Sequence, residues 1–142
     1  MKICLLMLGK TRRGEINAIL QDYAKRISRT CPIELVEVRD AEAALKRLDT
    51  NRAGVSVLLD AGGKSYDSGA FAVWIGELRD RGLREIIFVC GDADGFPNSL
   101  RERVKQKVSL SAMTYSHELA RAMLAEQIYR AFAILSGSPY PK

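Results

Sequence analysis

The segment Ile3-Cys4-Leu5-Leu6-Met7-Leu8-Gly9 is a continuous apolar run closed by a glycine. A run without polar alternation predicts a strand that is buried on both faces, as strands of parallel sheets are. Residues 15–28 follow with apolar side chains at helical spacing, which predicts an amphipathic helix. Together these two segments indicate the strand–helix alternation of an α/β fold.

The rest of the chain continues this alternation. Further strands are expected at residues 33–38, 55–59, 85–90 and 108–110. Further helices are expected at residues 41–48, at 68–81 with Ser68 as its cap, at 98–105 with Asn98 as its cap, and at 118–136. A length of 142 residues favours one domain over residues 1–142. The pattern predicts a parallel sheet flanked by helices.

The composition excludes several classes of protein. No apolar run approaches the roughly 20 residues of a membrane span, and the first residues are expected to form a strand rather than a signal peptide. Cys4, Cys31 and Cys90 are scattered without a CxxC motif, which argues against zinc and is typical of reduced thiols in a cytoplasmic protein. The net charge of +5 is compatible with an anionic partner such as nucleic acid.

Three loops follow strands of the predicted sheet, after Leu59, Cys90 and Leu110. Because ligands of open α/β sheets bind at the carboxyl ends of the strands, these loops locate a site. The loop 91–95 lacks the further ligands of a calcium loop, so its glycines are expected to admit a ligand rather than a metal. The loop 111–116 has hydroxyls but no GxSxG elbow, which favours binding of a polar ligand over a nucleophilic serine.

The last helix is apolar on nearly every side, so it must be covered all round, and a partner subunit is the natural cover in so short a chain. Glu126 and Arg130 lie four residues apart and are expected to pair. His117, the only histidine, begins this helix, where a capping and a chemical role are both open.

Several blocks of the chain are similar to one family. They are residues 58–64, 88–95, 109–114 with His117 following, the helix 119–131, and the tail Pro139-Tyr140. With residues 1–9, they resemble the RlmH family of SPOUT RNA methyltransferases over the whole chain. The resemblance implies a SPOUT (α/β-knot) fold with a C-terminal trefoil knot, a homodimer, and S-adenosyl-L-methionine as cofactor. It also implies methylation of N3 of a pseudouridine in the 23S rRNA of the ribosome.

The resemblance assigns roles by position. It implies cofactor contacts from Leu59, Gly91, Leu110, Ser111, Ala112, Met113, Thr114 and Tyr115. The candidates for catalysis are Tyr140, Lys142, His117, Arg121 and Arg130. The family has no separate RNA-binding domain, so surface cations are expected to meet phosphates, among them Lys10, Arg12, Arg13, Arg101, Arg103, Lys105 and Lys107.

The chain departs from the family at two places. Asp92 stands where members usually have a second glycine, and the chain ends in Pro139-Tyr140-Pro141-Lys142 where members usually end in Pro-Tyr-His. Two alternatives stay open: a SPOUT enzyme acting on another RNA, such as a tRNA, and a non-catalytic module that binds S-adenosylmethionine or the ribosome.

Overall fold

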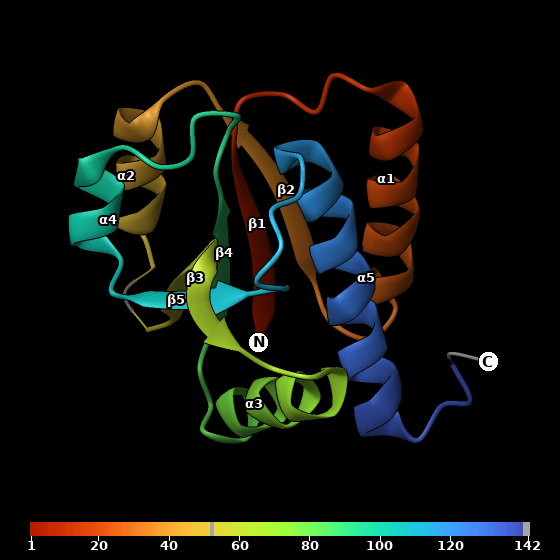
Figure 1. Cartoon of the computed structure of the whole chain (residues 1–142). Coiled ribbons are helices and arrows are strands. Elements are labelled where there is room, and N and C mark those ends of the chain that lie inside the picture. The colour runs from red at the N-terminus through yellow and green to blue at the C-terminus, as the bar shows by residue number, and fades with distance from the viewer. Residues whose placement is uncertain (52, 141–142) are drawn as a thin grey trace.

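The computed structural model describes residues 1–51 and 53–140. A five-stranded parallel sheet has the order β2-β1-β4-β3-β5 (Figure 1). The strands are β1 (Lys2–Leu8), β2 (Ile33–Val38), β3 (Val55–Ser65), β4 (Glu85–Cys90) and β5 (Gln106–Ser109). The helices are α1 (Gly14–Ser28), α2 (Ala41–Leu48), α3 (Ser68–Asp80), α4 (Asn98–Arg103) and α5 (His117–Ser136).

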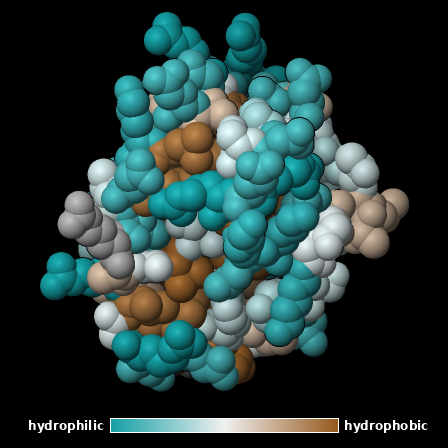
Figure 2. Space-filling model, turned by 90° about the vertical axis from the view of Figure 1, so that its left-hand side faces the viewer, coloured by the Kyte–Doolittle hydropathy of each residue, from teal (hydrophilic) through white to brown (hydrophobic). Residues whose placement is uncertain are grey.

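The helices divide between the two faces of the sheet. α1 and α5 lie side by side and share one hydrophobic core with α3, whereas α2 and α4 form a second core on the other face (Figure 1). The side that carries α2 and α4 is covered mainly by hydrophilic residues, with apolar residues visible between them (Figure 2). Within the described ranges, no helix combines the length and apolar character that a bilayer crossing needs.

β1 supplies both cores. Ile3, Leu5 and Met7 pack into the core under α1, α3 and α5. Cys4, Leu6 and Leu8 alternate with them and pack into the core under α2 and α4. The prediction of a strand buried on both faces is therefore confirmed.

Two predicted helix caps are wrong. The cap of α3 is Asp67, whose carboxylate accepts a hydrogen bond from the N–H of Ala70 (2.7 Å), while the Ser68 hydroxyl donates to Oε1 of Gln127 (2.8 Å). Asn98 lies inside the first turn of α4, and α4 ends at Arg103 rather than Lys105 because β5 already begins at Gln106.

The largest departure from the predicted elements concerns β3, which was expected to end at Leu59 and continues to Ser65. Leu59 and Lys64 both align with Val108 of β5, so a bulge of β3 separates two stretches of pairing with the same strand. A Cβ atom at Gly63 would lie 2.6 Å from the backbone carbon of Lys107. Gly63 therefore permits a close approach of the two strands.

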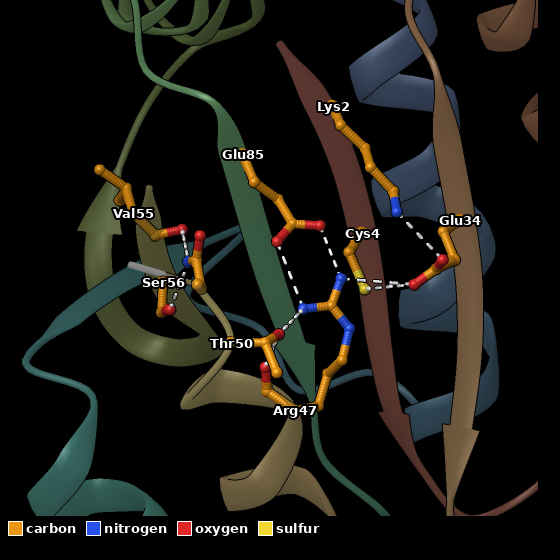
Figure 3. A network of polar contacts seen from close by, with 9 residues as sticks. Lys2, Cys4, Glu34, Arg47, Thr50, Val55, Ser56 and Glu85 are labelled. Carbon is orange, nitrogen blue, oxygen red and sulfur yellow. Dashed lines mark hydrogen bonds and ion pairs between the residues drawn. The ribbon is translucent and has the colours of Figure 1, made fainter. Parts of the chain in front are cut away.

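An ion-pair cluster closes the amino edge of the sheet (Figure 3). Arg47 of α2 pairs with Glu85 of β4 (2.6 Å) and Glu34 of β2 (3.3 Å), and Glu34 also pairs with Lys2 of β1 (3.1 Å). Burial raises the pKa of the neighbouring Cys4 thiol to about 12, so this thiol is not reactive at neutral pH. The cluster joins three strand starts to α2 and lies opposite the edge where ligands bind such sheets.

α5 is covered largely by its own chain. Its buried apolar residues include Leu124, Ile128 and Phe132, which belong to the core shared with α1 and α3. Leu119 and Ile134 are the large apolar side chains of α5 that stay exposed, each at 42%. The apolar circumference of α5 therefore does not by itself require a second subunit, and both the dimer and the knot stay predictions.

We predict that Gly63→Ala destabilises the protein by about 1–3 kcal/mol, because the added methyl group overlaps the Lys107 backbone. Urea denaturation followed by circular dichroism measures the loss. The matched control is Gly62→Ala, whose new Cβ would have as its nearest neighbour Oδ1 of Asp60 at 4.0 Å. Equal stability of the two variants would contradict a tight β3–β5 contact.

Candidate cofactor and substrate site

The three predicted loops meet at one cavity of about 530 Å³ at the carboxyl edge of the sheet. This volume lies within the range of small-molecule sites. Seven of the eight residues predicted to contact the cofactor line it: Leu59, Gly91, Leu110, Ser111, Met113, Thr114 and Tyr115. Ala112 does not line the cavity.

The cavity exists because β3 leaves β4 at its carboxyl end. The two strands pair as far as Leu59 and Cys90, after which the bulge of β3 carries Asp60 and Ala61 into the cavity wall. Burial raises the pKa of the Cys90 thiol to about 12, so the sulfur in this wall stays a neutral thiol.

An ion pair stands on the cavity wall. Nη1 of Arg101 lies 3.1 Å from Oδ2 of Asp60, and the Arg101 guanidinium lies 5.6 Å from the ring centre of Phe96. Burial raises the pKa of Asp60, but hydrogen bonds from the Gly62 N–H and Arg101 outweigh burial and bring the pKa below its usual value. Asp60 is therefore an anion at neutral pH. The sequence placed Asp60 directly after a strand and suggested Arg101 as a cation for RNA phosphates, but it did not predict that the two form an ion pair on the cavity wall.

The loop 91–95 accommodates its unusual aspartate. Oδ1 of Asp92 accepts a hydrogen bond from the N–H of Asp94 (2.9 Å), and the Asp92 carbonyl accepts one from the N–H of Gly95 (3.0 Å). A Cβ at Gly91 would lie 2.8 Å from the Gly95 carbonyl oxygen. Asp92 thus stabilises its own turn, while Gly91 is the position where the turn tolerates no side chain.

No group of three or more metal-ligating side chains that could hold a metal ion occurs within residues 1–51 and 53–140. Asp92 and Asp94 are joined instead by the hydrogen bond that closes their turn.

The hydroxyls of the loop after β5 organise its backbone. Ser109 Oγ donates to the Ser111 carbonyl (2.9 Å), and Ser111 Oγ accepts from the Met113 N–H (3.1 Å). Ser116 Oγ accepts from the Leu119 N–H (3.2 Å) and so caps α5. These contacts favour a binding loop over a nucleophilic serine.

The catalytic candidates separate in space. His117 lines the cavity, with Nε2 3.8 Å from Oε2 of Glu118. Arg121 does not line it: the side chain is fully buried and donates hydrogen bonds to the carbonyls of Leu8 (2.6 Å) and Gly9 (3.1 Å). Arg121 is therefore placed to hold the end of β1, and within one chain it has no access to the cavity.

Arg130 and Tyr140 form a second cluster with Glu126. Arg130 pairs with Glu126 (2.5 Å), as its spacing predicts, and the Tyr140 hydroxyl donates to Oε2 of Glu126 (2.6 Å). Arg130 follows His117 by 13 residues of α5, or about 20 Å along the helix axis. Neither Arg130 nor Tyr140 lines the cavity, and Lys142 lies outside the described residues.

The protonation of this cluster follows from its contacts. Burial and the Glu126 carboxylate raise the pKa of Tyr140, so the phenol stays protonated and acts as a donor. Burial raises the pKa of Glu126, but the hydrogen bonds from Arg130 and Tyr140 outweigh it and lower the pKa overall. Glu126 also lines a cavity of about 400 Å³ that shares Leu110 with the first. The spacing of Glu126 and Arg130 predicted their ion pair but not the contact of Glu126 with the tail.

Comparisons with known proteins define the class. A family described as "Predicted SPOUT methyltransferase" matches residues 1–141. Ribosomal RNA large subunit methyltransferase H of Solibacter usitatus is 45% identical over 141 residues, and that of Pelobacter propionicus is 39% identical over 151 residues; each alignment covers 99% of both chains. The chain therefore belongs to the SPOUT methyltransferase family, and the resemblance to the RlmH family is confirmed.

Solved structures support the fold. A probable methylase family protein from Haemophilus influenzae matches with a TM-score of 0.62 at 9% identity, covering 99% of this chain and 70% of that one. The SpoU methyltransferase AviRb from Streptomyces viridochromogenes, solved in complex with AdoMet, matches with a TM-score of 0.57 at 13% identity over 97% of this chain. This chain spans 61% of the AviRb chain. The predicted SPOUT fold class is confirmed.

We predict that Arg121→Met lowers the free energy of unfolding by about 3 kcal/mol, because the Leu8 and Gly9 carbonyls lose a charged donor. Denaturant titration measures the change. Arg130→Met is the control: it removes the same charge from a partly exposed ion pair and should cost about 1 kcal/mol or less. A smaller loss for Arg121→Met than for Arg130→Met would overturn the positioning role.

Proposed function

We propose that the chain is a cytoplasmic, S-adenosylmethionine-dependent methyltransferase whose substrate is N3 of a pseudouridine in large-subunit rRNA. The observation that carries this proposal is the convergence of three strand-end loops on one cavity, in a chain 45% identical to an rRNA large subunit methyltransferase H. The AviRb structure with AdoMet shows that a protein of this fold binds that cofactor.

The residues of the cavity suit such a cofactor. Leu59, Leu110 and Met113 offer apolar surface to an adenine ring, and the loop after β5 offers backbone groups to polar atoms. Gly91 allows the turn 91–95 in the cavity wall to fold tightly, because a Cβ atom there would overlap the backbone of Gly95. When bound, S-adenosylmethionine supplies a methyl group activated by the sulfonium charge.

The protein must orient the acceptor and manage one proton. N3 must lose its proton, to a base or to water, when it takes up the methyl group that the cofactor would supply. Positioning of the two reactants supplies much of the rate, and a proton acceptor contributes further. His117 is the titratable candidate in the cavity wall that the sequence had singled out. Tyr140 is protonated at neutral pH, so it suits hydrogen-bond donation rather than proton removal, and donation to the ring would replace its hydrogen bond to Glu126.

A homodimer would bring the two clusters together. Arg130 lies about 20 Å along α5 from His117 of the cavity wall within one chain, and Tyr140 contacts Glu126 one helical turn before Arg130. A second copy can place its own Arg130, Tyr140 and Lys142 over the cavity of the first. We therefore propose an active site built from two chains. Because the proposed substrate is rRNA, we also propose the ribosome as the partner.

We predict that Gly91→Val weakens S-adenosylmethionine binding about ten- to a hundredfold, because the side chain would displace Gly95. Isothermal titration calorimetry measures the affinity. Gly62→Ala, which does not line the cavity, should bind like the native chain. Unchanged affinity of Gly91→Val would remove the loop 91–95 from the cofactor site.

A second experiment tests catalysis and the shared site. The native chain should transfer labelled methyl groups to ribosomes that carry the pseudouridine. A chain truncated after Ser138 should be about 10²–10⁴-fold slower, because it loses Tyr140 and the following tail. Mixing the truncated chain with Gly91→Val should restore part of the activity, since one intact cavity then meets one intact tail.

The outcomes separate the alternatives. Transfer of the label to tRNA instead of rRNA would favour the other substrate. Binding of cofactor and ribosomes without turnover would favour the non-catalytic module. If the mixture of the truncated chain and Gly91→Val is no more active than either variant alone, while the native chain is active, the shared site is contradicted. Full activity of the truncated chain would remove the tail from catalysis.

A further inference from the structure

The connection between β1 and α1, residues 9–13, is held by an unusual pair of side chains. In the described part of the chain, the buried charged residues are Glu118, exposed at 7%, and Arg121, exposed at 0%. Both belong to the first turns of α5, and both bind this one connection.

The contacts hold the connection at three points. Arg121 donates to the Gly9 carbonyl (3.1 Å) and to the Thr11 hydroxyl (3.0 Å). Oε1 of Glu118 accepts from the backbone N–H of Arg13 (2.9 Å). These residues are more than a hundred positions apart in sequence, so the connection is fixed by tertiary contacts rather than by its own turn chemistry.

Such an anchor is costly. A charged side chain is buried only where hydrogen bonds replace its hydration, and a surface connection between a strand and a helix needs no buried charge at all. Nε of Arg121 even lacks a partner among the described residues. Because the chain accepts the desolvation free energy of two buried charges, we infer that the conformation of residues 9–13 serves more than the connection of β1 to α1.

The anchored segment exposes cations. Lys10, Arg12 and Arg13 are all exposed. Arg13 pairs with Glu15 (2.8 Å), and Glu37 accepts from the backbone N–H of Thr11 (2.9 Å). Within residues 1–51 and 53–140, neither Lys10 nor Arg12 makes an ion pair.

The segment lies at the same edge of the sheet as the cavity. β1 pairs with β4, and Met7 aligns with Cys90 of the cavity wall. The connection from β1 to α1 runs past the start of α5, where His117 of the wall precedes Glu118 (Figure 1). Lys10 and Arg12 therefore lie at the carboxyl edge of the sheet, the edge that also carries the cavity.

We propose that residues 9–13 form a preordered phosphate-binding segment that holds the RNA backbone beside the cavity, with Lys10 and Arg12 as the contacts and Arg121 and Glu118 as positioning residues. This inference rests on the proposed function. Fixing the segment before binding lowers the entropy lost when the RNA docks. Phosphate contacts of this kind set orientation, which the transfer step requires.

The test compares two double variants of equal charge. Lys10→Gln/Arg12→Gln removes the proposed contacts, and Arg81→Gln/Arg84→Gln removes two exposed cations at the opposite edge of the sheet. Binding to purified large ribosomal subunits is measured as a function of salt. Each lost contact should reduce the log–log slope by about 0.7–0.9, so the first variant should lose about 1.4–1.8 and the second nothing.

Two further readouts separate contact from damage. Lys10→Gln/Arg12→Gln should keep native S-adenosylmethionine affinity and native kcat at saturating ribosome concentration, with KM raised at least tenfold. Arg121→Met, studied at a temperature where it is folded, should lose salt slope although both cations remain. A merely structural role for Arg121 would leave the slope unchanged.

Each result decides the inference. Equal slopes for both double variants, whether native or reduced, overturn it, because the segment would then carry no special contact. If the native chain methylates rRNA while Lys10→Gln/Arg12→Gln behaves as native, the inference is wrong and the proposed function stands. If the native chain neither binds nor methylates rRNA, the proposed function fails and the inference fails with it.

Discussion

The close approach of Gly63 to the Lys107 backbone is the constraint on which the cavity depends. β3 must pair with β4 on one side and β5 on the other, yet the ligand site needs these neighbours to separate at their carboxyl ends. The bulge between Leu59 and Lys64 meets both demands, since β3 pairs with β5 before and after it. Only a residue without Cβ fits where the two backbones then touch.

The elements that hydrophobic pattern alone controls were predictable. Strands such as Ile33–Val38 and Glu85–Cys90 agree with the expected bounds, because each begins and ends where its apolar or alternating pattern does. The continuation of β3 through Ala61-Gly62-Gly63 was not, because two glycines predict a turn as readily as a close contact of strands. The sheet order also depends on long-range pairing that no local pattern records.

The candidate site divides in the same way. Position after a strand located Leu59, Gly91 and Leu110, since parallel strands bring their carboxyl ends to one edge. The roles of the charged residues of α5 were harder to predict, because helical spacing does not show which part of the molecule each side chain faces. Arg121 and Arg130 look alike in sequence, but Arg121 is fully buried against the end of β1, whereas Arg130 forms a half-buried ion pair with Glu126.

The first turns of α5 join functions that the sequence keeps far apart. Ser116 caps the helix and ends the binding loop, His117 lines the cavity, and Glu118 with Arg121 holds the connection after β1. A shift of α5 along its axis would therefore move the cavity wall and the cations of residues 9–13 together. Methyl transfer depends on the alignment of donor and acceptor. One rigid helix start that fixes both the cavity wall and residues 9–13 therefore holds them in alignment better than two independent loops would. The burial of Glu118 and Arg121, which is unfavourable on its own, is explained because these side chains fix the connection after β1 to the start of α5.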